Sequence, residues 1–332
     1  MKRKTPFLES ALLLLVLVIF TALNISAGLQ SNLISFDSLT ALPPGVTVPA
    51  RAAADEHGRS PATPTLLPTF LPAGAPPPAA APALLPEVIG FSVLNRPISV
   101  IAFPAAAGLS QAVILINGIH GDETNAAPLL ESLMSGLDGG ALALPAALAL
   151  YVIPEMNPDG VADNRRLNTN GVDLNRNWQT YDWRTNIELS ATERLAAGGG
   201  PQPFSEPETR AARDWLLSLR DQYPGGLTVV YFHAAFAPDG LVSPGAHFVN
   251  GQELADTPSR LVGEALAEAA GYRYYNFWPG GYHVTGDAST WAVANGIRAL
   301  TVELPTHDSL TEAELKNLHE AIVTVINWLA FK

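Results

Sequence analysis

The spacing of apolar residues changes several times along this chain, and the changes predict alternating strands and helices. Continuous apolar runs at 112–116 and 147–153 predict strands, and the second is typical of a strand buried on both faces of a sheet. Two further segments rich in apolar residues, 227–232 and 297–302, also predict strands. Two shorter runs, 88–92 and 98–103, flank Asn95-Arg96-Pro97 and predict a hairpin. Helical spacing is found at 124–137, 206–219, 258–270, 291–295 and 311–330. Together these segments predict an α/β fold, with a mixed, mostly parallel sheet and helices on both faces.

Residues at the ends of the helical segments are typical of helix boundaries. Ser205 and Glu208 match the capping-box pattern, and so do Thr311 and Glu314. Gly271 directly follows the segment 258–270 and is expected to end that helix. These signals support the predicted helices and fix their starting points more closely than the apolar spacing does.

The amino-terminal residues have the pattern of an export signal. Lys2-Arg3-Lys4 precedes an apolar run from Ala11 to Leu23. The run is shorter than the roughly 20 residues of a comfortable membrane helix. Ile25-Ser26-Ala27 is a mediocre cleavage site, so residues 1–27 are either a cleaved signal peptide or an amino-terminal membrane anchor. Both possibilities place the protein outside the cytoplasm, secreted or membrane-anchored.

A proline-rich segment follows the apolar run. Twelve of the 28 prolines lie between Ala41 and Pro86, in stretches such as Pro76-Pro77-Pro78. No period of two or 3.6 residues is present, so residues 28–86 are interpreted as a disordered, Pro/Ala-rich linker. The folded domain is expected to cover residues 87–332, a usual size for one domain.

Composition and charge exclude several classes of function. The 332 residues carry a formal charge of −12, which argues against non-specific nucleic-acid binding because that requires a basic surface. The chain has no cysteine, so disulfides, cysteine-ligated zinc and a cysteine nucleophile are excluded. A large apolar fraction, 48%, is enough for a substantial core.

Candidate metal ligands lie where the predicted buried strands end. His120 and Glu123 follow the strand 112–116, in a turn that contains Gly118 and Gly121. Ligands of open α/β sheets bind beyond the carboxyl ends of the strands. Catalytic zinc takes three protein ligands from histidines and carboxylates and leaves one position open. His120 and Glu123 therefore predict two ligands, and His233, at the end of the strand 227–232, predicts the third.

Two other patterns that could carry chemistry are incomplete. His319-Glu320 resembles the start of a His-Glu-x-x-His zinc helix, but Val323 occupies the position of the second histidine. Ser243 lacks the glycine two residues before it that a nucleophile elbow requires. The first pair is therefore interpreted as part of a solvated helix face.

The longest segment without periodicity, Pro154 to Phe204, is rich in arginines and amides. Loops of this length inside a compact domain are usually functional. The segment contains Asn157-Pro158-Asp159-Gly160, Arg165-Arg166-Leu167-Asn168 and Gly171-Val172-Asp173-Leu174-Asn175-Arg176-Asn177. Arginine binds carboxylates through two parallel hydrogen bonds, so the segment predicts recognition of an anion.

These motifs, in this order, resemble the zinc metallocarboxypeptidase family, the carboxypeptidase A-like peptidases. The resemblance runs through His120-x-x-Glu123, Arg166-x-Asn168, the run from Gly171 to Asn177, His233, Tyr282 and Glu303, and covers about residues 87–332. It implies the three-layer sandwich of that family. The short loops, together with Gly281-Tyr282-His283-Val284-Thr285-Gly286, are similar to the compact bacterial type and to murein peptide amidases.

The resemblance implies a role for each matching residue. His120, Glu123 and His233 would bind Zn²⁺, and Asp173 would accept a hydrogen bond from the other ring nitrogen of His120. Glu303 would act as general base and acid, taking a proton from zinc-bound water and giving it to the leaving amine. The remaining roles belong to Arg166 as the oxyanion donor, Asn175 and Arg176 as the ligands of the substrate carboxylate, and Tyr282 as the residue that closes over the substrate.

Some of these assignments have competitors. Arg165 competes with Arg166, and Tyr275 competes with Tyr282. Ala234 replaces the serine that is common after the third zinc ligand, which affects substrate contacts and leaves the metal unaffected. Ser289, the residue near the expected specificity pocket, is small and polar and indicates no clear side-chain preference.

The leading hypothesis is therefore an exported zinc carboxypeptidase that hydrolyses a carboxy-terminal peptide bond. Within the same chemistry, the alternative is a murein peptide amidase acting on cell-wall peptides. A zinc deacylase of the aspartoacylase or succinylglutamate desuccinylase type is a further alternative, since it uses a similar Gly-x-His-Gly-x-Glu turn. A catalytically inactive binding module is the hypothesis from another class, which the presence of all ligands and of Glu303 disfavours. We expect a monomer, with a peptide substrate, no nucleic-acid partner and a possible membrane tether.

Overall fold

The computed structural model describes residues 85–108 and 110–330. The predicted signal or anchor, residues 1–27, and the predicted linker up to residue 84 lie outside the described residues. Strand β1 (Leu85–Phe91) includes Leu85 and Pro86, which precede the expected domain boundary at Glu87. Within the described part of the chain, no helix is both long and apolar enough to span a membrane.

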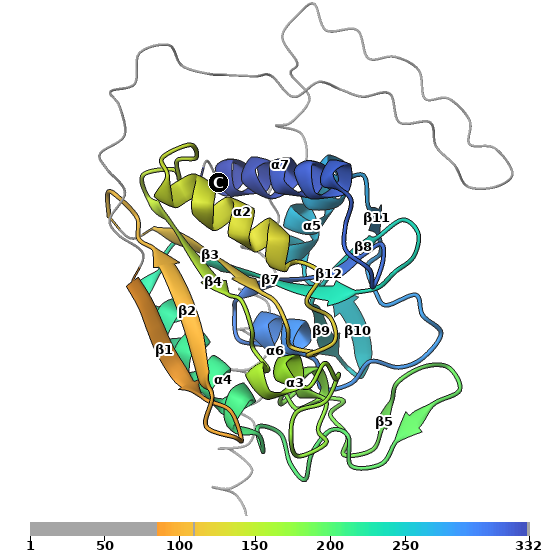
Figure 1. The fold of residues 1–332 in the computed structure, drawn as a ribbon. Coiled ribbons are helices and arrows are strands. Elements are labelled where there is room, and N and C mark those ends of the chain that lie inside the picture. Colours follow the sequence, from red (N-terminus) through yellow and green to blue (C-terminus); the bar gives the residue numbers. More distant parts are fainter. Residues whose placement is uncertain (1–84, 109, 331–332) are drawn as a thin grey trace, which may run out of the picture. The chain divides into compact units, whose positions relative to one another are not determined.

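One eight-stranded sheet organises the fold, with strand order β1-β2-β4-β3-β7-β12-β8-β11 (Figure 1). Its central strands β4, β3, β7 and β12 are parallel to their neighbours in this group, whereas β2 runs antiparallel to β4 and β8 runs antiparallel to β12. The sheet is therefore mixed and mostly parallel, as the apolar runs predicted. Its further strands are β2 (Pro97–Phe103), β3 (Gln111–Ile116), β4 (Leu148–Ile153), β7 (Leu227–Ala234), β8 (Leu241–Pro244), β11 (Arg273–Tyr274) and β12 (Arg298–Leu304).

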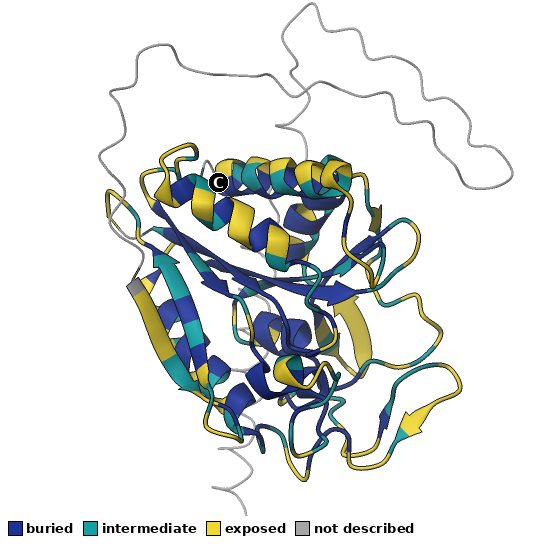
Figure 2. Cartoon of the chain, in the orientation of Figure 1, coloured by how far each residue is buried: buried dark blue, intermediate teal, exposed yellow. Residues whose placement is uncertain are grey.

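Helices cover both faces of this sheet, which completes the predicted three layers (Figure 1). On one face, α2 (Ala127–Asp138), α5 (Thr257–Ala270) and α7 (Glu312–Leu329) pack on one apolar core. On the other face, α4 (Pro207–Gln222) and α6 (Ala288–Ala294) pack on a second core. Figure 2 shows the central strands in dark blue, buried between the layers, while the helices present exposed residues to solvent.

The helix boundaries follow the sequence signals in most cases. The capping box of Thr311 and Glu314 is formed at the start of α7, and Gly271 ends α5 in the left-handed conformation with φ +70°. The predicted capping box of Ser205 and Glu208 is wrong. Glu206 is the N-cap of α4, and its side chain caps no backbone group. Glu208 instead accepts hydrogen bonds from the backbone N–H of Val93 and from the side-chain amide of Asn168. These tertiary contacts use the carboxylate that the capping box would require.

The segment 154–204 forms a covering loop with little regular structure. It contains the short helix α3 (Pro158–Ala162), the 3₁₀ turn η2 (Leu174–Arg176) and a small hairpin of β5 (Ile187–Glu188) and β6 (Arg194–Leu195). A second small hairpin, β9 (Ala246–Val249) and β10 (Gln252–Ala255), was not predicted. Its turn is Asn250-Gly251, and both residues have positive φ, +52° and +77°. The Asn-Gly pair is the sequence signal that could have identified this hairpin.

Asp159 connects the covering loop to the first hairpin. Its buried carboxylate accepts hydrogen bonds from the Ser92 hydroxyl at 2.9 Å, the Leu94 N–H at 3.0 Å, Arg96 at 2.8 Å and the Thr169 hydroxyl at 3.1 Å. Burial acts to raise the pKa of Asp159, but these hydrogen bonds outweigh it and hold the pKa below its usual value. The Asn157-Pro158-Asp159-Gly160 motif therefore has a structural role at this residue.

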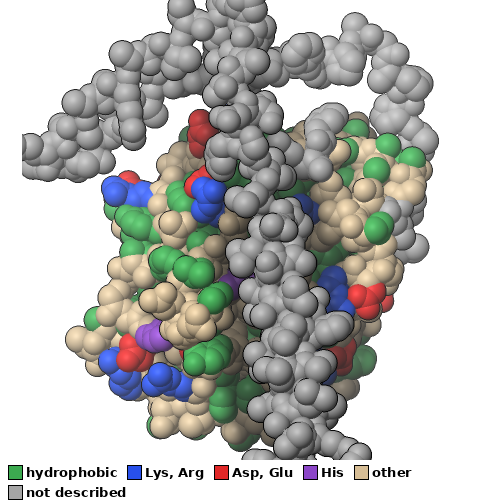
Figure 3. All heavy atoms as spheres, turned by 180° about the vertical axis from the view of Figure 1, so that it is seen from behind, with side chains coloured by type: hydrophobic (Ala, Val, Ile, Leu, Met, Phe, Trp, Pro, Cys, Tyr) green, Lys and Arg blue, Asp and Glu red, His purple; other side chains and the backbone are tan. Residues whose placement is uncertain are grey.

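Charged side chains on the rear face of the molecule occur in small groups of mixed sign. Figure 3 shows this face, and no continuous area of Lys and Arg is visible on the part that the grey atoms leave uncovered.

Candidate active site

Three adjacent parallel strands bring predicted metal ligands and the predicted general base to one edge of the sheet. His120 follows β3, while His233 and Glu303 lie near the ends of β7 and β12. In the register of these two strands, Glu303 is the direct partner of His233. The carboxyl ends of parallel strands meet at the same edge, so side chains distant in sequence become neighbours there.

Alternation along the strands places His233 and Glu303 on the same face. In β7, Val230 and Phe232 belong to the core under α2, α5 and α7, whereas Tyr231 belongs to the core under α4 and α6. Successive side chains of a strand point to opposite faces, so His233 points to the same face as Tyr231, the face covered by α4 and α6. Glu303 likewise alternates with Val302, which lies in the first core. The covering loop closes this face beyond α6.

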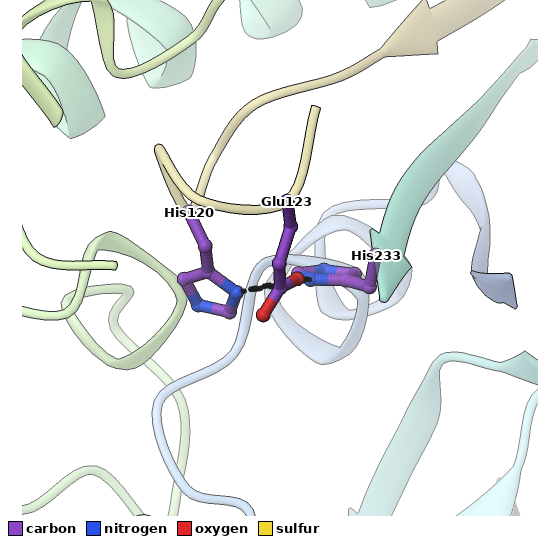
Figure 4. Close-up of side chains that lie close together, drawn as sticks. All are labelled: His120, Glu123 and His233. Carbon is purple, nitrogen blue, oxygen red and sulfur yellow. Dashed lines mark hydrogen bonds and ion pairs between the residues drawn. The ribbon is translucent and has the colours of Figure 1, made fainter. Parts of the chain in front are cut away.

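The three predicted metal ligands converge on one point (Figure 4). The Nδ1 atom of His120 lies 2.9 Å from Oε2 of Glu123, and Nδ1 of His233 lies 2.9 Å from the same oxygen. The two Nδ1 atoms are 3.2 Å apart. Figure 4 shows His120 and Glu123 entering from the turn after β3 and His233 entering from the end of β7.

This donor set fits a zinc ion. Zinc bonds of about 2.0–2.1 Å place tetrahedral ligand atoms roughly 3.3 Å apart, close to the separations found here. All three side chains are buried, with at most 5% of their surface exposed. In the described part of the chain they are the only group of three such residues that could hold a metal ion. Zn²⁺ is therefore the cofactor that His120, Glu123 and His233 are built to bind.

Neighbouring side chains fix the orientation of the ligands. Asp173 accepts a hydrogen bond from Nε2 of His120 at 3.0 Å, which directs Nδ1 of that ring towards the metal position. Arg166 donates to Asp173 at 3.0 Å and to Oε1 of Glu123 at 2.9 Å. Asn175 lies 3.3 Å from Nε2 of His233. Three of the residues that the resemblance implied, Asp173, Arg166 and Asn175, thus contact the ligands directly.

The turn that carries His120 depends on a close approach of two backbone segments. A Cβ atom added to Gly121 would lie 2.0 Å from the carbonyl carbon of Gly160 in α3. Gly118, in the same turn, has φ +63°, a conformation that favours glycine. The two glycines therefore allow the ligand turn to pack against the covering loop.

Replacing Gly121 by alanine is expected to destabilise the protein by about 1–3 kcal/mol, since the added methyl group meets backbone that cannot move aside. Chemical denaturation would measure the change in the free energy of unfolding. Gly139→Ala is a suitable control, because the nearest atom to its added Cβ is 3.1 Å away and its φ is −76°. Equal stability of Gly121→Ala and wild type would contradict the packing argument.

A cavity of about 290 Å³ opens beside the three ligands. Of the nine predicted site residues, all except Asp173 line this cavity. Arg176 is buried, with 3% of its surface exposed, and its NH1 group donates a hydrogen bond to the carbonyl oxygen of Asn175 at 2.8 Å. Within the described part of the chain, the Nε atom of Arg176 has no hydrogen-bond partner. A buried guanidinium with an unpaired donor indicates a place for an anion.

The structure separates the predicted residues from their competitors. Arg165 lies on the surface side and pairs with Asp163 at 3.6 Å, while Arg166 reaches the metal ligands. Tyr282 lines the cavity and packs against Trp278, with ring centroids 5.6 Å apart. Tyr275 packs against Phe236 instead and does not line the cavity. The geometry therefore favours Arg166 and Tyr282.

Burial and neighbouring charges shift the protonation equilibria of the site. Burial raises the pKa of Glu303 to about 8, and the Glu123 carboxylate adds to this effect. Burial also acts to raise the pKa of Asp173, but Arg166 and His120 outweigh it and hold the pKa well below its usual value. Burial lowers the pKa of His233, which favours the neutral ring that a metal ligand requires.

Comparison with known protein families identifies the family of this fold. The family model described as zinc carboxypeptidase matches residues 80–322. The chain belongs to the zinc carboxypeptidase family. Relatives that it matches bear the names of peptide hydrolases, so the protein is a zinc-dependent hydrolase of peptides.

Individual relatives are similar over most of their length. Murein peptide amidase A of Escherichia coli K12 is 28% identical over 248 residues, which covers 73% of this chain and 89% of the relative. Carboxypeptidase B of Astacus astacus is 27% identical over 243 residues, which covers 66% of this chain and 78% of the relative. The crystal structure of murein-tripeptide amidase from Escherichia coli O157 aligns with a TM-score of 0.52 and 26% identity, over 80% of this chain and 99% of that chain.

Several residues in the cavity of this zinc carboxypeptidase were not predicted from the sequence. They include Trp278, Asp287 and Glu253, which lie on the loop before α6, at the start of α6 and on β10. Asp287 is the N-cap of α6 and accepts from the Thr290 N–H at 2.9 Å. A helix-cap pattern at Asp287 was visible in the sequence, but its position in the cavity depends on the fold.

Proposed function

We propose that this zinc-dependent hydrolase removes the carboxy-terminal residue from a peptide. Arg176 carries this proposal, because its side chain lines the cavity beside the metal ligands and its Nε atom has no hydrogen-bond partner among the described residues. A free α-carboxylate is the anion that a peptide end supplies, and arginine binds it through charge-assisted hydrogen bonds. Asn175 lines the same wall, and its Oδ1 accepts from the Ala288 N–H at 3.0 Å, which holds the amide in place.

The residues around the scissile bond would have separate catalytic roles. Zinc, when bound by His120, Glu123 and His233, supplies a Lewis acid that polarises water and the scissile carbonyl. Glu303 accepts a proton from the attacking water and returns it to the nitrogen of the leaving residue. Its raised pKa of about 8 suits a group that must both take and give a proton near neutral pH.

Two further cavity residues would act on the bound substrate. Arg166 donates hydrogen bonds towards the carbonyl oxygen as negative charge develops on it. Tyr282 covers the substrate side of the cavity and, with Trp278, limits the access of water.

Carboxylate recognition can be tested by varying the enzyme and the substrate together. For Arg176→Gln, kcat/KM on a peptide with a free carboxylate is expected to fall about 10- to 100-fold, the usual effect of a hydrogen bond to a charged group. A peptide with a carboxamide end lacks that charge, so the same substitution should change its kcat/KM much less. Equal losses on both substrates would show that Arg176 does not bind the carboxylate.

Cell-wall peptides are the second candidate substrate. Support comes from the relative named murein peptide amidase A, which this chain matches over 89% of its length. Muropeptides and blocked dipeptides should be compared at equal concentration. Turnover of dipeptides alone would remove the murein candidate, and turnover of N-acyl amino acids alone would favour the zinc deacylase alternative.

We also propose that the enzyme is exported as a monomer, secreted or held at a membrane by its amino-terminal segment. The basic residues before the apolar run from Ala11 to Leu23 support this proposal. Cell fractionation of the full chain and of a variant without residues 1–27 tests it. Accumulation of both forms in the cytoplasm would contradict export.

A further inference from the structure

The segment that carries Tyr282 borders two cavities. Tyr282 and Val284 line the cavity beside the metal ligands, whereas His283 and Thr285 line a second cavity of about 360 Å³. The other residues around the second cavity belong to the covering loop, mainly to its hairpin of β5 and β6. A segment that borders open space through alternate side chains gains less support from packing than a buried strand does. Its position therefore depends strongly on its hydrogen bonds.

Few backbone hydrogen bonds hold this segment. At its carboxyl end, the carbonyl oxygen of Gly286 accepts from the Trp178 N–H at 3.0 Å. Between residues 276 and 285, all of which the structure describes, the backbone makes a single hydrogen bond, from the His283 N–H to Oε2 of Glu188 at 2.8 Å. The residue that follows the covering tyrosine is therefore fixed by one carboxylate of the covering loop.

A contact across the hairpin orients this carboxylate. Arg194, on β6, pairs with Oε1 of Glu188 at 3.0 Å, which leaves Oε2 to accept from the His283 N–H. Glu188 and Arg194 are direct partners in the register of β5 and β6. An ion pair on the surface contributes little to stability by itself. Its effect here is to direct Glu188 towards the segment beside the cavity.

The covering loop also contacts the ring of His283. Its Nε2 atom lies 3.3 Å from Oδ2 of Asp182, whose side chain is 8% exposed. Oδ1 of Asp182 accepts from the Thr180 hydroxyl, so the carboxylate is itself fixed. On the cavity side, the neighbouring Tyr282 packs against Trp278. Two carboxylates of the covering loop thus hold His283 through its backbone and its ring, while Tyr282 faces the cavity.

We propose that Glu188 is a positioning residue, which holds Tyr282 over the cavity through its hydrogen bond with the His283 N–H. The inference rests on the proposed function, in which Tyr282 covers the substrate. Glu188 does not line the active-site cavity and therefore acts only through the segment that it holds. A hydrogen bond to a charged acceptor is stronger than one between neutral groups. The hairpin of β5 and β6, which lies apart from the main sheet in Figure 1, thereby influences substrate binding.

Hydrogen exchange tests the contact itself. In Glu188→Ala the His283 amide loses its acceptor, so its exchange with deuterated solvent is expected to be about tenfold or more faster than in the wild type, the usual effect of a hydrogen bond to a charged group. Glu193→Ala is the matched control, because Glu193 is exposed on the same hairpin and its carboxylate bonds to none of the described residues. It should leave the exchange unchanged. Equal exchange of the His283 amide in Glu188→Ala and the wild type would overturn the inference.

Kinetics test the consequence for the reaction. Glu188→Ala is expected to raise KM about five- to tenfold on a peptide with a free carboxylate, with a smaller change in kcat and the same zinc content. In a Tyr282→Ala background the same substitution should change KM less than about twofold, because the group that Glu188 positions is gone. Glu193→Ala should match the wild type in both backgrounds.

Two kinetic results would overturn the inference: an unchanged KM in Glu188→Ala, or a rise of equal size with and without Tyr282. The second result would show that Glu188 affects the site without the tyrosine. If the wild type cleaves no peptide with a free carboxylate, the proposed function is refuted, and with it the role of Tyr282 on the substrate. Hydrogen exchange distinguishes that case, because it decides the contact between Glu188 and His283 without any substrate.

Discussion

Replacing Glu303 by glutamine is expected to lower kcat about 10³- to 10⁴-fold while leaving the zinc content unchanged. Glutamine keeps the size of the side chain but cannot take a proton from water and return it to the leaving amine. General acid–base catalysis contributes about 10²–10⁴-fold, and one residue that serves both steps should lie near the upper end. Steady-state kinetics and metal analysis on the same preparation measure the two quantities.

The register of β7 and β12 makes this prediction specific. Glu303 is the strand partner of His233, so it lies beside the metal position without being one of the three converging ligands. Glu320→Gln, on the exposed face of α7, is the control for loss of one negative charge and should retain full activity. Activity of Glu303→Gln within tenfold of the wild type would assign the proton transfer to another group.

Removing a metal ligand should have a comparably large effect through a different route. His233→Ala is expected to lose bound zinc and to reduce kcat/KM by about 10³-fold or more. A bound metal contributes several kcal/mol to charge stabilisation, and each 1.36 kcal/mol corresponds to about tenfold in rate. Treatment of the wild type with a chelator should give the same loss, and added Zn²⁺ should restore the wild type but not the variant.

His319→Ala is the control for this experiment. His319 lies on α7 and contacts the hydroxyl of Ser132 at 3.0 Å, far in sequence from the three ligands. It should bind zinc and hydrolyse peptides as the wild type does, in agreement with the interpretation of His319-Glu320 as a helix face. A chelator-resistant wild type that contains no zinc would contradict the assignment of the metal centre.

Local sequence patterns predicted six of the eight strands of the main sheet, all except β8 and β11, because each pattern records a local physical requirement. The run Ala112-Val113-Ile114-Leu115-Ile116 is apolar throughout because β3 is buried on both faces. The capping box of Thr311 and Glu314 satisfies backbone groups within one turn of α7, so nothing distant could override it. The capping box predicted at Ser205 and Glu208 was wrong for the complementary reason, since Glu208 bonds to Val93 and Asn168, residues from other parts of the chain.

The hairpin of β9 and β10 shows where the local signals were weak. Strands of four residues, such as β9 and β10, bury little and have little alternation, so their apolar pattern does not stand out. Only the turn residues Asn250 and Gly251, both with positive φ, marked this hairpin in the sequence. Its position beside α6 brings Glu253 to the cavity, and no local pattern could have indicated that neighbour.

The sequence by itself determined the metal chemistry of this protein. His120 and Glu123 are three residues apart in one turn, and His233 ends a buried strand, so residue type and local position indicated these three ligands, whereas the role of Glu303 was implied by the family resemblance. The tertiary structure alone decided which of Arg165 and Arg166 reaches the ligands, which tyrosine covers the cavity, and which charges line its far wall. Those choices depend on segments distant in sequence that meet only when the covering loop, β10 and α6 pack around the sheet edge. The physical reason is that local spacing fixes how a side chain leaves its own element, whereas packing of the whole domain fixes what that side chain meets.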